Sequence, residues 1–246
     1  MTDLVMTGAS ADELWPLVRD FHYSKRMPSA IRHCFAWREA GGLFGDTGAP
    51  FAGAIYGNPC NRNWNQEAVE LLRLVRRDSA AISLSEMLNW SLRWLRSNTP
   101  APFALSYADT AEGHHGGIYQ ATNWVYIGSR TEACPAFELP DGTKKHSRQV
   151  NRELGSRSIE HVAKLRPDWK PVQGKPKHLY IFPLRQKWPT IARRYGWEAK
   201  PYPKPLYAAR PLDAPGTTGI EAGATPAGRS NSDQARTPPA GRKVTM

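Results

Sequence analysis

A helix pattern between two buried strand patterns, near the middle of the sequence, limits the possible folds more than any other feature. The run VELLRLV over 69–75 is apolar except for Glu70 and Arg73, as in a central strand. Helical spacing follows over 84–97, and FALSYAD over 103–109 has the pattern of a second strand. This order predicts a parallel crossover within a mixed α/β sheet.

Two capping boxes predict where helices begin. Ser10 with Glu13, and Ser83 with Glu86, have the spacing at which each side chain accepts a hydrogen bond from the other residue's backbone N–H. The first box predicts a helix over 11–21, and the second begins the crossover helix.

The remaining elements are shorter and are predicted from composition and flanking turn residues. Strands are expected over 34–40, 51–57, 124–128 and 178–184, with a short helix over 115–123. We expect one domain over 1–208, whose portion 144–208 is rich in Lys and Arg. Residues 209–246 are dominated by Gly, Pro, Ala, Thr and Ser, and we expect a disordered tail there.

The charge of the chain points to a polyanionic partner. The formal net charge is +11 and the pI is about 9.8, which favours nucleic acid, although a basic protein that only needs solubility has the same balance. The odd number of cysteines, three without C-x-x-C spacing, predicts neither a disulfide framework nor a structural zinc site and fits a cytoplasmic setting. The sequence has no signal-peptide pattern and no apolar run of roughly 18 residues, so we expect no membrane span.

The junction between the central strand and the crossover helix is a candidate phosphate site. A helix N-terminus presents free N–H groups and a partial positive charge, and Arg76 and Arg77 add full charges directly before it. A pyrophosphate-bearing cofactor would suit this junction. An ordinary capped helix with two exposed arginines explains the same residues.

Chemically active side chains gather in SYADTAEGHHGGIYQATNWVYIG, residues 106–128. Asp109 ends a strand and Tyr119 lies on the short helix, and both can serve as general acids or bases. His22 and Tyr23 follow the first helix, where a polar aromatic pair often faces a cleft. The alternative is structural: Asp109 caps a helix, Tyr119 lies in the core and His22 has no chemical role.

The element order, with ELLRLV running into a helix start, resembles the GNAT superfamily of acyl-CoA-dependent N-acetyltransferases. The resemblance implies that a strand, a loop and a helix hold the coenzyme A pyrophosphate. In GIYQATNWVYIG, Tyr119 has the position of the Tyr that lies near the thioester sulfur. The glycine-rich phosphate loop typical of the superfamily is absent from 76–83. The alternatives are therefore an ordinary N-acetyltransferase of a protein or small-molecule amine and a non-catalytic basic DNA-binding protein.

A second resemblance covers most of the ordered chain. It rests on FHYSKRMP (21–28), ELLRLVRRD (70–78), SEMLNW (85–90), SYADTAEGHHGGIYQATNWVYIGSR (106–130) and KHLYIFPL (177–184). Together these segments resemble the Mom family of phage DNA-modification proteins. The resemblance implies an enzyme that converts adenine in double-stranded DNA to a carbamoylmethyl (acetamido) adenine with an acyl-CoA donor such as acetyl-CoA. The product protects phage DNA from host restriction, and iron has been associated with the family.

The resemblance also implies roles for particular residues. It implies catalytic roles for His22, Tyr23, Asp109 and Tyr119. It also implies that His22, Tyr23 and Asp109 bind iron. The expected contacts with the cofactor are Arg73, Arg76, Arg77, Ser83 and Ser85. The expected contacts with DNA are Arg62, Lys144, Lys145, Arg148, Arg152 and Arg157. Tyr23 or Trp169 would stack on a flipped base unless these aromatics belong to the core. The glycines before Tyr119 would allow close approach of cofactor or base, and the oligomeric state stays open.

Overall fold

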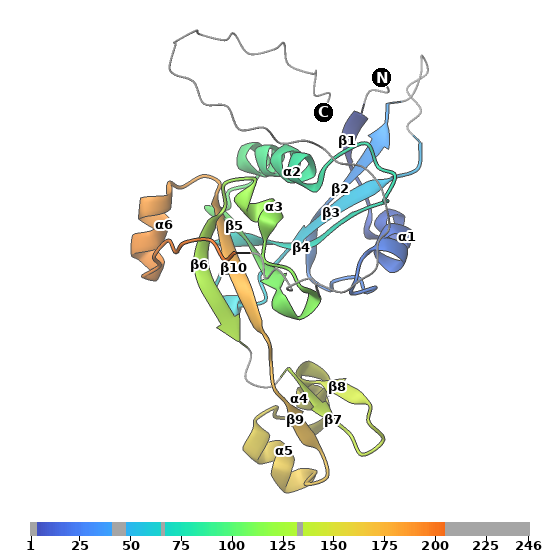
Figure 1. The fold of residues 1–246 in the computed structure, drawn as a ribbon, viewed down its shortest axis with the longest axis vertical. Helices are drawn as coiled ribbons and strands as arrows, with labels where there is room; N and C mark the ends of the chain where they lie inside the picture. Colours follow the sequence, from blue (N-terminus) through green and yellow to red (C-terminus); the bar gives the residue numbers. More distant parts are fainter. Residues whose placement is uncertain (1–3, 41–47, 65–66, 132–134, 205–246) are drawn as a thin grey trace, which may run out of the picture.

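A seven-stranded mixed sheet forms the body of the molecule (Figure 1). The computed structural model describes residues 4–40, 48–64, 67–131 and 135–204, so the expected tail over 209–246 lies outside the described residues. In spatial order the strands are β1 (Leu4–Gly8), β2 (Ile31–Glu39), β3 (Ala52–Gly57), β4 (Ala68–Arg76), β5 (Phe103–Asp109), β10 (Pro176–Pro183) and β6 (Val125–Thr131). Neighbouring strands are antiparallel except β4 and β5, which are parallel. The predicted mixed α/β class and its parallel crossover are confirmed.

The helices α1 (Ala11–Phe21) and α2 (Leu84–Asn98) begin where the two capping boxes predict. They cover opposite faces of the sheet, which the alternation along β3 demonstrates. Ile55 belongs to the core cluster under α1, whereas its neighbours Ala54 and Tyr56 belong to the cluster under α2. Each helix is therefore held by an apolar stripe on one side of a single sheet.

The helix α6 (Trp188–Tyr195) lies on the same face as α1. Its Ile191 packs with Phe103 and Leu105 of β5, while the intervening Ala104 belongs to the cluster under α2. The short helix α3 (Gly117–Gln120) contributes Tyr119 to the α2 side. It is shorter than the expected 115–123, because Gly116, with a left-handed φ of 84°, precedes its first residue and the chain continues in turns after Gln120.

The parallel strands β4 and β5 pair over only three residues and then separate. Ala68–Glu70 align with Phe103–Leu105, and no further β4–β5 pair follows. Opposite β3 the register of β4 skips Leu72, since Ile55 aligns with Arg73 and Tyr56 with Leu71. This β-bulge lies just past the separation point, a place where bulges often re-aim side chains beside a site.

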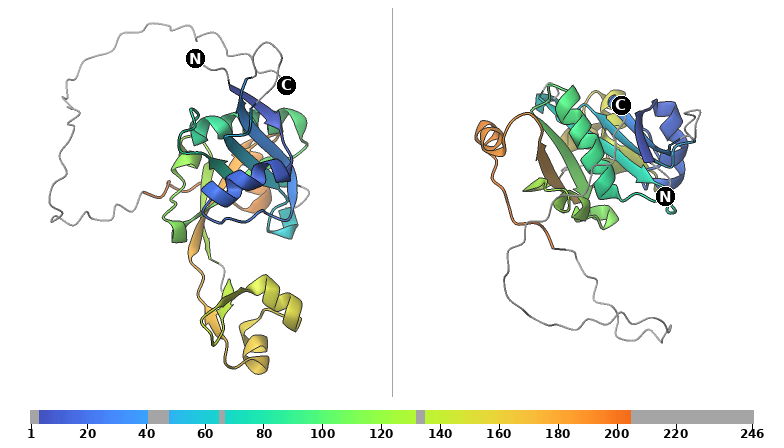
Figure 2. Two further views of the ribbon diagram at one scale, coloured as in Figure 1. Left: turned by 90° about the vertical axis from the view of Figure 1, so that its right-hand side faces the viewer. Right: turned by 90° about the horizontal axis from the view of Figure 1, so that it is seen from above.

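A separate small unit, here called the insert, occupies residues 136–172 between β6 and β10 (Figure 2). It contains β7 (Ala136–Glu138), β8 (Lys144–His146), α4 (Ser147–Leu154), α5 (Ile159–Leu165) and β9 (Lys170–Val172). The strands form an antiparallel sheet in the order β8-β7-β9. The insert has its own core of Phe137, Val150, Val162 and Trp169. It projects from the body at the end where β6 leaves and β10 enters the sheet.

None of the helices in the described ranges combines the length and apolar character that a membrane crossing needs.

Candidate functional site

β4 and β5 separate beyond Glu70 and Leu105, and the opening between them is here called the crook. Two linked hydroxyl groups, of Ser106 and Tyr119, border it. Ser106 of β5 donates from Oγ to the Leu71 carbonyl oxygen of β4 at 3.2 Å, which spans the two strands where they separate. Its Oγ lies 2.8 Å from the Tyr119 hydroxyl oxygen. Burial raises the pKa of Tyr119 to about 12, so the phenol keeps its proton at neutral pH. Tyr119 therefore presents an un-ionised hydroxyl at the crook.

Gly116 is the glycine on which this arrangement depends. Its φ is +84°, and a Cβ at this position would lie 2.4 Å from the ring of Tyr180. The Tyr180 hydroxyl in turn donates to the His115 carbonyl oxygen at 2.6 Å. At Gly116 the space is thus taken by Tyr180, which packs against Tyr119 with ring centroids 4.9 Å apart, and the expected approach of a cofactor or base along these glycines stays a prediction.

The opposite face of the crook carries a buried carboxylate. Glu70 shares this face with Arg73, because the bulge at Leu72 shifts the alternation of β4. The Glu70 carboxylate accepts the backbone N–H of Cys60 at 2.7 Å and faces the Cys60 thiol at 3.7 Å. Burial raises the pKa of Glu70, which is 6% exposed. No ion pair with Glu70 occurs among the residues that the structure describes, so this carboxylate is suited to take up a proton.

Arg73 ties the loop after α1 to the sheet. Its Nε donates to the Arg26 carbonyl oxygen at 3.0 Å, and Nη1 donates to its neighbour's carbonyl at Leu72. The guanidinium lies within electrostatic reach of Glu70 and Tyr23, and burial lowers its pKa. The structure therefore places this expected cofactor contact beside the His22–Tyr23 loop.

Three aromatic rings, of His22, Tyr23 and His114, pack together at the loop that follows α1. His22 stacks on Tyr23 with centroids 4.4 Å apart, and Tyr23 meets His114 edge to face at 5.4 Å. Tyr23 is 51% exposed, whereas His22 is buried. Tyr23 is thus free to stack on a ligand ring, while the expected alternative, Trp169, is buried in the core of the insert.

Asp109 organises the loop that carries His114. One carboxylate oxygen accepts the Ala111 N–H at 2.9 Å, which caps the 3-10 helix η2 (Thr110–Glu112). The other lies 2.9 Å from the Lys177 Nζ, and the Asp109 carbonyl oxygen accepts the His114 N–H at 3.1 Å. The capping role that was the structural alternative for Asp109 is present in the fold.

The structure gives no support for iron at the expected ligands. Within the described part of the chain, no group of three or more His, Cys, Asp or Glu side chains could hold an ion. The Asp109 carboxylate is already engaged by a lysine and a backbone N–H. One ring nitrogen of His22 is engaged as well, by the backbone N–H of Ser24 at 3.1 Å. The donor set thus gives no support for iron at His22, Tyr23 and Asp109.

The expected phosphate contacts at the start of α2 are partly engaged by the helix itself. Ser83 Oγ accepts the Glu86 N–H at 3.2 Å, donates to the Glu86 carboxylate at 2.8 Å and lies 3.1 Å from Ser85 Oγ. Arg76 donates to the Ala80 carbonyl oxygen at 3.2 Å. Arg77 is exposed, and its side chain has no partner among the described residues. Of the expected set, Arg77 is the cation most available to an anion.

The expected DNA contacts of the insert differ in whether other groups of the protein already engage their side chains. Lys145 pairs with Glu153 at 2.7 Å and lies over the Trp169 ring at 4.9 Å, so it stabilises the insert. Arg148 reaches the Cys60 thiol beside Glu70. Lys144 and Arg152 are exposed, and no contact engages their side chains within the described ranges. Arg157 lies between α4 and α5, and Arg62 lies in η1 (Arg62–Trp64), where its side chain is outside the described residues.

Glu70 and Arg148 both lie at the Cys60 thiol, a cluster that the sequence alone did not indicate. A carboxylate inside an apolar strand is the signal that could have identified Glu70, since a buried charge needs a reason. No local signal identifies Arg148, because its position beside Cys60 depends on how the insert is attached.

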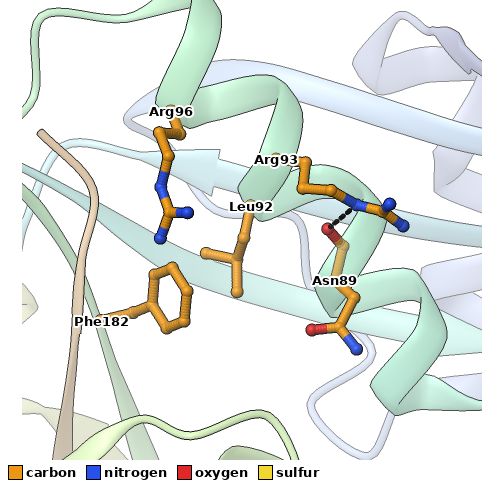
Figure 3. Close-up of a pocket in the computed structure, with 5 residues that line it drawn as sticks. All are labelled: Asn89, Leu92, Arg93, Arg96 and Phe182. Carbon is orange, nitrogen blue, oxygen red and sulfur yellow. Dashed lines mark hydrogen bonds between the residues drawn. The ribbon is translucent and has the colours of Figure 1, made fainter. Parts of the chain in front are cut away.

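A pocket of about 360 Å³ lies elsewhere, between α2 and β10 (Figure 3). Its lining residues are Asn89, Leu92, Arg93, Arg96 and Phe182. The Arg96 guanidinium lies 5.4 Å from the centre of the Phe182 ring. None of the expected site residues borders this pocket.

Comparison with known proteins gives one family and a group of solved structures. The sequence model of the Mom protein family matches residues 4–204. No curated protein matches the chain.

Several solved structures to which this chain is similar are acetyltransferases. The ribosomal-protein-S18-alanine N-acetyltransferase from Escherichia coli has 8% identity and a TM-score of 0.43, covering 75% of this chain and 96% of its own. A probable acetyltransferase from Staphylococcus epidermidis has 8% identity and a TM-score of 0.45, with 74% and 99% covered. A Bacillus subtilis acetyltransferase in complex with CoA has 12% identity and a TM-score of 0.40, with 74% and 99% covered.

Proposed function

The chain belongs to the Mom protein family, and we propose that it modifies adenine in double-stranded DNA with a unit derived from an acyl-coenzyme A. The product that the family resemblance implies is a carbamoylmethyl (acetamido) adenine. One observation carries the proposal: β4 and β5 separate beyond Glu70 and Leu105, and chemically active side chains border the opening on both faces.

The opening suits an extended chain with amide groups. Past Glu70, β4 and β5 no longer pair within the described residues, and the carbonyls of Leu71 and Leu72 are taken by Ser106 and Arg73. The backbone groups of β4 that follow on this edge have no strand partner in the described ranges and can pair with a ligand. The start of α2 lies directly after β4, where Arg77 and the helix N-terminus favour phosphate. An acyl-coenzyme A has both parts, and when bound it supplies the activated acyl group.

Tyr119 is the proposed proton donor at the crook. Its hydroxyl is un-ionised at neutral pH and is fixed by Ser106, which itself is held by Leu71. Because Ser106 Oγ donates to Leu71, the Tyr119 proton points at Ser106 Oγ in this structure. When the hydroxyl turns toward a bound acyl group, it can polarise that group or give its proton to a departing sulfur. Its orientation is set by contacts with the sheet, from Ser106 of β5 and the Tyr180 ring of β10.

Glu70 is the proposed proton acceptor on the other face. Its raised pKa moves the carboxylate toward the range in which a general base works at neutral pH. The Cys60 N–H fixes the carboxylate, and Arg73 and Arg148 lie within electrostatic reach. An adenine amine brought to this side could lose its proton to Glu70 as its nitrogen bonds to the methyl carbon of the acyl group. That bond replaces a C–H bond, so the step also passes two electrons and a proton to an external oxidant, and an ammonia-level nitrogen replaces the thioester sulfur to complete the carbamoyl group.

The charge distribution supports a DNA substrate. Residues 144–204 contain sixteen Lys and Arg against four Asp and Glu, so most of the excess positive charge belongs to the insert, β10 and the segment that follows. Phosphate contacts of this kind give strong, salt-dependent affinity. The insert leaves the body beside Asp109, since its exit strand β10 begins next to the end of β5. Duplex held by the insert would therefore lie near the opening.

Adenine must leave the stack before its amine can react, at a cost of a few kcal/mol. The exposed ring of Tyr23, at the mouth of the site, offers a surface on which an extruded base can stack.

Mass spectrometry of nucleosides tests the proposal. The protein is produced in bacteria, plasmid DNA is isolated, and its digest is searched for a heavier deoxyadenosine. A mass increase equal to a carbamoylmethyl group supports the proposal. An unmodified digest from cells that contain folded protein rejects it and favours an acetyltransferase of another amine or a binding protein without chemistry, which titration with acetyl-CoA separates.

A further inference from the structure

The ring of His22 is held in one tautomer by the turn that follows α1. Its Nδ1 lies 3.1 Å from the backbone nitrogen of Ser24 and 2.9 Å from Ser24 Oγ. A backbone N–H can only donate, so Nδ1 must be the acceptor and carries no proton. A neutral imidazole has one ring proton, which in His22 is therefore on Nε2.

The ring is also neutral at physiological pH. The same Ser24 contact requires this, because a charged imidazolium carries a proton on both ring nitrogens and could not accept at Nδ1. At pH 7 the Nδ1 lone pair is committed to Ser24 and the Nε2 proton is retained. His22 then has no free lone pair in the plane of its ring.

The Nε2–H group makes no hydrogen bond within the described residues. It is not among the fully enclosed polar atoms that lack a partner, although His22 itself is buried. Its surroundings are the site itself: Tyr23 stacks on the ring, and Arg73 and His114 lie within electrostatic reach. A fixed neutral donor that is not fully enclosed inside a site is an anchor for an acceptor atom of a ligand.

We propose that His22 contacts the substrate as a fixed Nε2–H donor to the carbonyl oxygen of the acyl group, and serves neither as a proton acceptor nor as a metal ligand. The proposal rests on the proposed function for the presence of that acyl group. A donor aimed at a carbonyl oxygen stabilises the negative charge that develops there in the transition state. An uncharged imidazole can fill this role without the cost of burying a cation.

Iron ligation through Nε2 would need the opposite tautomer. The proton would then be on Nδ1 and would point at the Ser24 N–H, so two donors would face each other at 3.1 Å. Ligation through Nδ1 would displace Ser24 from the ring. Either mode requires the turn after α1 to rearrange.

Nitrogen NMR of the full chain, labelled with ¹⁵N in histidine, tests the tautomer without any assay of activity. The His22 signals are assigned from their loss in His22→Gln. We expect protonated Nε2 and unprotonated Nδ1 from pH 6 to 8, unchanged when Fe²⁺ is added. An Nδ1–H tautomer, or Fe²⁺-dependent broadening confined to His22, would overturn the proposal.

A pair of variants tests the donor in the reaction. Gln keeps an N–H donor near the position of Nε2 and lacks a ring lone pair, whereas Leu removes the donor. We expect His22→Leu to lower kcat on the order of 100-fold, as for a lost oxyanion donor, and His22→Gln to stay within about tenfold of the wild type. Equal loss in both folded variants, or loss only in DNA affinity, would count against the proposal. A wild-type chain without DNA modification contradicts the proposed function, and the NMR result then decides the tautomer by itself.

Discussion

The hydroxyl of Tyr119 lies 2.8 Å from Oγ of Ser106, at the point where the two parallel strands of the sheet separate. The described structure contains a second buried pair of this type, Tyr56 with Ser91, also at 2.8 Å, but that pair joins β3 to α2 and involves no residue of β5. The chain thus supplies its own control for the role of Tyr119.

We predict that Tyr119→Phe lowers DNA modification about 100-fold or more, because the proton donor at the crook is lost. Its free energy of unfolding should fall by about 1 kcal/mol, the usual contribution of one hydrogen bond. Tyr56→Phe should cost similar stability and leave modification unchanged. Nucleoside quantification and thermal unfolding of both variants measure this. Equal activity in the two variants would remove Tyr119 from the reaction.

We predict that Glu70→Gln lowers DNA modification and changes the free energy of unfolding by an amount that depends on pH. Because burial raises the pKa of folded Glu70 above its unfolded value, its favourable contribution is present at low pH and is lost as pH rises through the folded pKa. The free energy of unfolding of the variant minus that of the wild type should therefore be larger at pH 7.5 than at pH 4.5. Modification should fall at least tenfold, since the proton acceptor is gone.

Denaturant unfolding of both proteins at the two pH values gives the comparison. A stability difference that does not change with pH would mean that Glu70 titrates normally.

Gly116→Ala should disrupt the site from within the core. Its φ of +84° disfavours any Cβ, and the new atom would overlap the buried ring of Tyr180. We expect a loss of more than about 2 kcal/mol in the free energy of unfolding. Gly117→Ala is the matched control: φ is not positive there, and the nearest atom, at 3.1 Å, belongs to the movable His115 side chain. A change within about 1 kcal/mol is expected for the control.

Asp109→Ala should lower modification on the order of 100-fold, because the loop that carries His114 loses its cap. Lys177→Ala removes the ion-pair partner and leaves the cap in place. Since Lys177 is half exposed, that pair contributes little, and activity should stay within about threefold. Equal losses in the two variants would show that the ion pair, and not the cap, is what matters.

Lys144→Ala should weaken DNA binding without affecting the fold, because its side chain is exposed and unengaged in the described structure. The slope of log affinity against log salt should fall by about 1. Lys145→Ala should instead lower the melting temperature of the insert, since Lys145 pairs with Glu153 and packs on Trp169. Fluorescence anisotropy with a duplex at several salt concentrations measures the slope. An unchanged slope for Lys144→Ala would place DNA elsewhere.

The parts of the fold that the sequence predicts are those with local signals. α1 and α2 begin at Ser10 and Ser83 because a capping box acts within one helical turn. β1 and the three-residue strands of the insert have no such signal, since their existence depends on partners distant in the chain. The same reason hides Arg148, which reaches Cys60 only through tertiary structure.

The candidate site follows the same division. Residues next to an element boundary, such as His22, Tyr23 and Asp109, are recognisable because a strand or helix end delivers them to one edge of the sheet. Which groups they meet is a tertiary property. The Ser24 N–H at His22 and the Lys177 ammonium at Asp109 are contacts that no spacing in the sequence predicts, and they alter the chemistry expected of both residues.

The central claim is that the two carbons of an acyl group bound at the β4–β5 opening become the carbamoylmethyl group on adenine. Bacteria producing the wild-type chain or Tyr119→Phe are grown with ¹³C-labelled acetate, and the deoxyadenosine of their plasmid DNA is analysed by mass spectrometry. The account predicts a carbamoylmethyl deoxyadenosine that carries the label in wild-type cells and is nearly absent in the variant. A modified base without label, or equal modification in both strains, would contradict it.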